Sequence, residues 1–179
     1  NAEWAHVDLK AQTWVIPAGN SKNGREHLIH LSDFAKERLE MLKEHCASAT
    51  WLYPTRKGTG PMIRNALQRQ FHDRQIDPGK CLKAHRVSEE QALVVEGGIW
   101  TAHDLRRTGA TMMGELGIHS DVIDRVLNHV EPKKVTRTYQ RQVLMAERKR
   151  AFEVLGERLN LLYRTDQQNI VVGKFRQAG

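Results

Sequence analysis

A histidine, a carboxylate and two arginines lie close together in the segment "HDLRRT", residues 103–108. At roughly 100° per residue in a helix, Arg106 falls at the edge of the apolar stripe, whereas Arg107 points further into solvent. A guanidinium at the edge of a core has its stem held by neighbours and its fork exposed, which suits bidentate phosphate binding. His103 is within reach of the same point, so the segment could hold an anion.

Two further residues downstream could take part in the same chemistry. His129 follows in "VLNHV", at an expected helix end, and Tyr139 follows in "KKVTRTYQR". A phenol has a pKa near ~10, so a tyrosine nucleophile at neutral pH needs nearby cations or a base. Four cations surround this tyrosine in the sequence: Lys133, Lys134, Arg137 and Arg141.

The elements that must position these residues begin with a small sheet. Residues 7–9, 13–17 and 27–31 have strand-like apolar patterns, and the turn-rich "AGNSKNG" separates the second from the third. This pattern predicts an antiparallel meander. Ser32 can cap a helix that continues to about Cys46, and residues 62–75 predict another helix.

The second half of the chain is predicted to be helical. A helix begins at Thr101, with Leu105 and Met113 in its apolar stripe, and Gly117 is suited to end it in a left-handed conformation. Ser120 is expected to cap the next helix, and Asn128 to end it in the same way. A short segment at about 133–141 and a long amphipathic helix from about 143 to 162 follow. The fold class is therefore α+β, mainly α, with a small N-terminal antiparallel sheet packed on a helical bundle.

The composition favours a nucleic-acid partner. The 179 residues include 28 Lys and Arg against 21 Asp and Glu, a net charge of +7, which attracts a polyanion. Cys46 and Cys81 form no Cys-x-x-Cys pair, so we expect neither a disulfide framework nor a zinc site. The sequence contains no apolar run that predicts a membrane span and no secretory leader. We expect one domain in a reducing cytoplasm.

The order His-x-x-Arg, Leu-x-His, Tyr resembles the C-terminal catalytic motifs of tyrosine recombinases, especially the phage-type integrases of bacteria. The resemblance runs through "TAHDLRRTGATMMGELGIHSDVIDRVLNHVEP" and the "TYQR" that follows it. The segment "VDLKAQTWVIPAGNSKNGREHLIHLS" is similar to the sheet of this family, whose turn supplies a catalytic lysine. Because four separated motifs agree, the fold expected is that of the recombinase catalytic domain.

The resemblance implies a role for each of five residues. Tyr139 would attack the scissile phosphate and form a 3′-phosphotyrosyl link, while Arg106 would clamp the non-bridging oxygens. His103 and His129 would hydrogen-bond the phosphate, with His103 the better acceptor of the tyrosine proton. Lys22 would protonate the leaving 5′-oxygen. Side-chain cations neutralise the phosphate, so no metal or other cofactor is expected.

Lys10 and Arg25 are weaker candidates for the role of Lys22, and His27 and His30 do not have metal-ligand spacing. The implied activity is site-specific DNA recombination, in phage or genomic-island integration and excision. The implied partners are double-stranded attachment sites, a homotetramer on DNA and accessory DNA-bending or directionality proteins, with no membrane. A bacterial, nucleoid-associated location follows from these partners.

Two departures from the family pattern stand out. The family usually has Gly where this chain has Asn128, and Asn is the next most tolerant residue of a left-handed turn. No residue here matches the first arginine of the family, which lies on a helix before the sheet. Because the chain also begins with Asn1 rather than Met, residues 1–179 are expected to be a truncated catalytic domain without a core-binding domain, and to recombine poorly alone.

The sequence is also compatible with other functions. The helix, glycine turn and helix from Thr101 to His129 could form a helix-turn-helix, but "SDVIDRV" would present Asp121 and Asp124 to DNA, which disfavours a recognition helix. A type IB topoisomerase-like enzyme would use a similar catalytic set. A DNA-binding regulator or remnant could keep the fold without catalysis. The C-terminal "NIVVGKF" could dock in cis or in trans.

Overall fold

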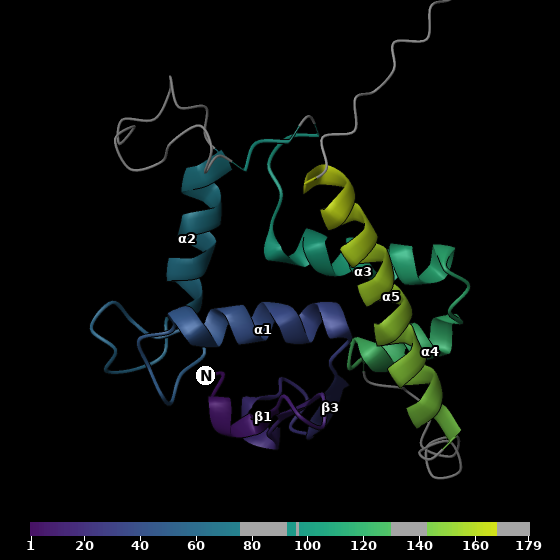
Figure 1. The fold of residues 1–179 in the computed structure, drawn as a ribbon, viewed down its shortest axis with the longest axis horizontal. Helices are drawn as coiled ribbons and strands as arrows, with labels where there is room; N and C mark the ends of the chain where they lie inside the picture. Colours follow the sequence, from purple (N-terminus) through teal and green to yellow (C-terminus); the bar gives the residue numbers. More distant parts are fainter. Residues whose placement is uncertain (76–92, 96, 130–142, 168–179) are drawn as a thin grey trace, which may run out of the picture.

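The computed structural model describes residues 1–75, 93–95, 97–129 and 143–167. One long helix, α5, crosses α3, α4 and the end of α1, and a small sheet lies below α1 (Figure 1). The β and 3₁₀ elements are η1 (Trp4–His6), β1 (Val7–Asp8), β2 (Thr13–Ile16), η2 (Ala18–Asn20) and β3 (His27–His30). The α-helices are α1 (Asp33–His45), α2 (Arg64–Gln75), α3 (Ala102–Glu115), α4 (Ser120–Val126) and α5 (Val143–Gln167).

The sheet is the predicted antiparallel meander, in the order β1-β2-β3. Val7 pairs with Trp14 across the first two strands, and Ile16 pairs with His27 across the second and third. The β1–β2 turn is tight because the Asp8 carboxylate accepts backbone N–H groups two and three residues on, at 2.9 and 2.8 Å. Such a local bond is the reason that Asp favours turns.

The first hydrophobic core forms between the sheet and α1, which lies directly above it in Figure 1. It consists of Trp4, Leu31, Leu39 and the fully buried Leu52. Ser32 caps α1 as predicted, its hydroxyl accepting the Ala35 N–H at 3.3 Å. The cap turns the chain directly from β3 into α1 and so places Leu39 over the sheet.

The second hydrophobic core joins α3, α4 and α5 and is built from Met113, Val122, Val126 and Ala151. Gly117 ends the α3 region with φ +81°, the left-handed conformation expected of it. Leu105 was predicted to lie in the buried stripe of α3, but it is 54% exposed. It lies in the first turn of α3, before the part of the helix that packs on α4 and α5.

Two predicted boundaries need correction. The N-cap of α4 is His119, whose ring Nδ1 accepts the Asp121 N–H at 3.4 Å, so Ser120 is the first helical residue. A neutral imidazole nitrogen can accept this bond as a serine hydroxyl would. The last helix, α5, continues past the expected end near residue 162 to Gln167.

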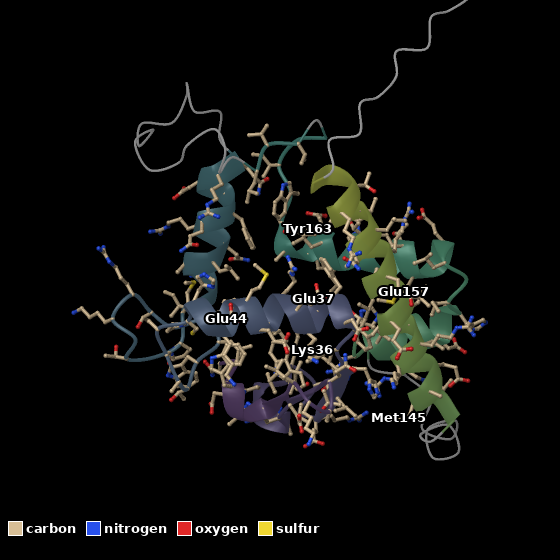
Figure 2. The ribbon with its side chains drawn as sticks, in the orientation of Figure 1. Lys36, Glu37, Glu44, Met145, Glu157 and Tyr163 are labelled. Carbon is tan, nitrogen blue, oxygen red and sulfur yellow. The ribbon has the colours of Figure 1, made fainter. Side chains whose placement is uncertain are left out.

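Helix α5 connects the two cores because it contacts α1, α3, α4 and β3. Figure 2 shows Met145 and Tyr163 at opposite ends of this helix. Near the C-terminal end, the Arg38 guanidinium of α1 lies 4.8 Å from the centroid of the Tyr163 ring. At this distance the cation is attracted by the face of the ring.

Helix α2 stands apart from the two cores, as Figure 1 shows. The helix predicted at residues 62–75 is present, but it begins two residues later than predicted, at Arg64. Gln75, at its end, exchanges two hydrogen bonds with the Trp100 backbone, at 2.9 and 2.7 Å, and the Phe71 ring packs 5.4 Å from the Trp100 ring. None of the described helices is long and apolar enough to cross a membrane.

Candidate active site

The first turn of α3 carries His103 and Arg106 and is held by a capping box. The Asp104 carboxylate accepts hydrogen bonds from the backbone N–H and the hydroxyl of Thr101, at 3.0 and 2.8 Å. These bonds, with smaller contributions from Arg107 and His103, hold the pKa of Asp104 below its usual value. The carboxylate of "HDLRRT" therefore has a structural role, because it starts the helix that presents the cations.

Arg106 and Arg107 are both exposed, although the helical periodicity predicted Arg106 at the edge of the packed face, and they make different contacts. The Arg106 guanidinium donates a hydrogen bond to the Leu127 carbonyl, which lies at the end of α4. The Arg107 side chain is 73% exposed and lies 3.5 Å from the Asp104 carboxylate. One bond orients the Arg106 fork, and the other N–H groups of an arginine fork are suited to bind an anion.

His129 lies directly after the turn that ends α4. Its backbone N–H donates to the Asp124 carbonyl at 2.9 Å, and its ring Nδ1 lies 2.8 Å from the Asp124 carboxylate. A carboxylate accepts, so Nδ1 carries the hydrogen and Nε2 is left for a ligand. The side chain is 52% exposed, so Asp124 orients a ring that solvent and a ligand can reach.

Lys22 lies on the loop between β2 and β3, and its side chain is exposed. The residues on either side of it, Ser21 and Asn23, both hydrogen-bond to Asn128, at 3.1 and 2.9 Å. The loop of Lys22 is therefore attached to the end of α4. The structure brings this loop, the Arg106 guanidinium and His129 to one place, and His103 lies one helical turn before Arg106.

Behind these residues, the sheet is attached to the helices by buried polar contacts. The ring Nε2 of His27 lies 3.2 Å from the Val126 carbonyl. Burial lowers the pKa of His27, the charges of Arg148 and Arg106 lower it further, and the bond to Val126 opposes them. The ring is therefore neutral at neutral pH and donates from Nε2. From α5, Arg148 donates to the Leu28 carbonyl.

Tyr139, the predicted nucleophile, lies outside the described residues, as do the four cations predicted to surround it. In the chain it comes between His129 and the start of α5 at Val143. Its role therefore stays a prediction. Lys10 and Arg25 are exposed residues of the β1–β2 and β2–β3 connections.

Three residues that hold the site were not predicted from the sequence. Asp124 was considered only as a charge unfavourable for a recognition helix, although an acid five residues before a histidine at a helix end could have indicated a pair. Ser21 and Asn23 flank the candidate lysine, and such small polar residues can bind backbone or amide groups across a loop. Their partner, Asn128, lies more than a hundred residues away.

The assembled groups are suited to an anion with several oxygens. Arg106 offers N–H donors, and Lys22 and His129 are exposed beside the same helix end. Within the described parts of the chain, no three His, Cys, Asp or Glu side chains form a group that could hold a metal ion.

Comparison with known proteins identifies a family. The family model described as Phage integrase family matches residues 1–144. A curated relative, Prophage integrase IntA of Escherichia coli (strain K12), is 29% identical over 148 residues, which make up 83% of this chain and 31% of the relative. The chain thus spans less than a third of that relative's length. No solved structure matches the chain.

Proposed function

From the membership of this chain in the phage integrase family, we propose that the protein cleaves and rejoins double-stranded DNA at specific attachment sites through a 3′-phosphotyrosyl intermediate. One observation supports this most strongly: Arg106, His129 and the loop of Lys22 come from three separate segments and meet at the end of α4. A scattered set of surface cations would not be oriented by specific hydrogen bonds in this way.

In the proposed reaction, the Tyr139 oxygen attacks the scissile phosphorus, and the bond from phosphorus to the 5′-oxygen breaks. The tyrosine proton passes to His103, and Lys22 gives a proton to the leaving 5′-oxygen. A 5′-hydroxyl of a partner strand later attacks the phosphotyrosine and releases the tyrosine. One phosphodiester is replaced by another, so no external energy source is consumed.

Arg106 and His129 would stabilise the charge that develops on the non-bridging oxygens. Donors aimed in advance at developing charge are worth more than mobile ones, because they need no reorganisation during the reaction. The Leu127 carbonyl orients the arginine, and the Asp124 carboxylate orients the histidine. These side chains would provide the positive charge, so the proposal includes no metal and no cofactor.

The proposed partners are attachment sites on double-stranded DNA, bound by a homotetramer that accessory DNA-bending or directionality proteins assist. The net charge of +7 favours DNA binding of this kind. The proposed biological setting is integration and excision of a phage or genomic island in the bacterial cytoplasm, on nucleoid DNA.

The decisive experiment traps the covalent intermediate. The protein is incubated with a nicked suicide DNA that carries its core site, and the covalent adduct is measured. Tyr139→Phe removes the nucleophilic oxygen and is expected to abolish the adduct. Tyr163→Phe is the matched control, because Tyr163 packs on Phe34 and Arg38 of α1, and it should leave the adduct in place.

Other outcomes would identify a different function. An adduct that persists in Tyr139→Phe would contradict the assignment of the nucleophile. DNA binding without any adduct from the unaltered protein would indicate a non-catalytic regulator. Relaxation of supercoiled DNA that lacks a core site would indicate a topoisomerase-like enzyme.

A further inference from the structure

Asn128 does more than end α4. Its φ of +57° is left-handed, and its backbone N–H donates to the Arg125 carbonyl at 3.1 Å, which closes the turn. A glycine would take this conformation without strain and would make the same backbone bond. The turn therefore does not need the Asn128 side chain, and the contacts of that side chain require another explanation.

The Asn128 side chain belongs to a closed ring of hydrogen bonds with two residues of the β2–β3 loop. Its amide nitrogen donates to the Ser21 hydroxyl at 3.1 Å. That hydroxyl donates to the Asn23 side-chain oxygen at 2.8 Å. The Asn23 amide nitrogen donates back to the Asn128 side-chain oxygen at 2.9 Å and to the Asn128 carbonyl at 3.3 Å. Each of the three side chains in this ring both donates and accepts a hydrogen bond.

The ring holds the residues on both sides of Lys22 and none of the Lys22 side chain. Within the loop, the Gly24 N–H donates to the Ser21 carbonyl at 3.0 Å, and the Arg25 N–H donates to the Asn23 side chain at 3.1 Å. The backbone at Lys22 is thus fixed from both sides, while its ammonium group stays exposed. Lys22 is thereby placed at a set position relative to His129, the residue after Asn128.

A neutral amide suits this location. An aspartate at position 128 would add a negative charge next to a lysine and a histidine, where it would compete with phosphate for the cations. It would also lose the donor that Ser21 accepts. Asn128 connects the two segments without changing the charge of the site.

We propose that Asn128 is a positioning residue that holds Lys22 at the leaving 5′-oxygen through Ser21 and Asn23. This inference rests on the proposed function, in which Lys22 donates the proton that the leaving 5′-oxygen needs. The ring of side-chain hydrogen bonds, rather than the left-handed turn, positions Lys22.

The test measures single-turnover cleavage of the suicide DNA by the unaltered protein and its Asn128→Gly variant. Glycine keeps the turn and the contact from Asn23 to the backbone carbonyl, and removes only the side chain. Cleavage is expected to slow about 10-fold, since a misplacement of about 1 Å can cost up to 100-fold. Lys22→Ala is expected to slow cleavage about 100-fold or more, the usual contribution of a general acid.

A second substrate separates positioning of the acid from a general structural effect. When sulfur replaces the bridging 5′-oxygen, the leaving group is a thiolate, whose conjugate acid has a pKa of about 8.5 and which departs without a proton. On this substrate, Asn128→Gly and Lys22→Ala are expected to cleave as fast as the unaltered protein. The double variant should be no slower than Lys22→Ala on the oxygen substrate.

Asn20→Gly is the matched control, because Asn20 lies in the same connection but donates to the Asn1 carbonyl at 3.0 Å, outside the ring. It should cleave at the unaltered rate. The inference is wrong if Asn128→Gly cleaves the oxygen substrate at the unaltered rate, if it slows both substrates equally, or if Asn20→Gly is equally slow. Failure of the proposed function gives a different result: the unaltered protein forms no adduct on either substrate.

Discussion

The two hydrophobic cores of this protein are alike in chemistry, and α5 packs on both, but the sheet also meets the helices of the second core through contacts of another kind. Trp4, Leu31, Leu39 and Leu52 hold the sheet to α1, and Met113, Val122, Val126 and Ala151 hold α3, α4 and α5 together. There, the sheet meets α4 and α5 through directional polar contacts. The candidate site lies along this junction, because Lys22 comes from the sheet and Arg106 from α3.

The polar contacts, rather than the apolar cores, determine how precisely the site residues are placed. Apolar burial is non-directional and allows small shifts between packed elements. A hydrogen bond requires a distance and an angle. Three sets of polar contacts cross the junction: His27 to Val126, Arg148 to Leu28, and the ring around Asn128. The cores therefore stabilise the fold, and the junction sets the position of the candidate site residues.

The largest expected effect comes from the arginine that reaches across to α4. Arg106→Ala should cost about 3–4 kcal/mol of transition-state stabilisation, by analogy with the loss of one preorganised donor. Arg107→Ala is the control, because this exposed side chain pairs with Asp104 in its own helix. The measurement is the rate of adduct formation, with the melting temperature recorded for both. Equal losses in rate would contradict the division of roles between the two arginines.

A smaller effect is expected where α5 passes the start of α1. A Cβ on Gly156 would overlap the Ser32 side chain, so Gly156→Ala should lower the free energy of unfolding by about 1–3 kcal/mol through overpacking. Gly109→Ala is the matched control in α3, since its Cβ would lie 3.9 Å from a Leu155 methyl. It should raise the stability by about 0.5–1 kcal/mol. Urea unfolding measures both, and a stabilised Gly156→Ala would show that the helices can separate at no cost.

The smallest effect concerns the pH dependence of the junction. The pKa of His27 is lowered in the folded protein, so below about pH 6.5 the unfolded chain binds a proton that the folded chain does not. Stability is therefore lost as the pH falls from 7 toward 5, by at most about 1.4 kcal/mol per pH unit from this residue. His27→Gln can keep a donor to Val126 without titrating.

The variant should consequently lose less stability than the unaltered protein over the same pH range. The carboxylates titrate in both proteins, so the difference between their two curves isolates His27. Parallel curves of unfolding free energy against pH would mean that His27 is not buried as a neutral donor.

Local patterns predicted most of the fold in the described residues. The meander, the Ser32 cap and the left-handed Gly117 and Asn128 all depend on residues near in sequence, and all are confirmed. The α4 cap was wrong by one residue, because a histidine ring nitrogen can replace a serine oxygen. The burial of Leu105 was wrong as well, because periodicity assigns a face to a residue and cannot tell whether another element covers it.

By itself, the sequence determined the residue types of the site and their order. The spacing of His103, Arg106 and His129 is local information, and the family match extends over the same segments. The Asp124 partner of the His129 ring is local as well, five residues away in the sequence. Only the tertiary structure shows that Leu127 holds Arg106 and that Asn128 holds the loop of Lys22. The bonds that attach the Lys22 loop join residues more than a hundred positions apart, and no periodic pattern encodes such a contact. They form because folding brings the β2–β3 loop against the end of α4, where the donors and acceptors of each segment pair with those of the other.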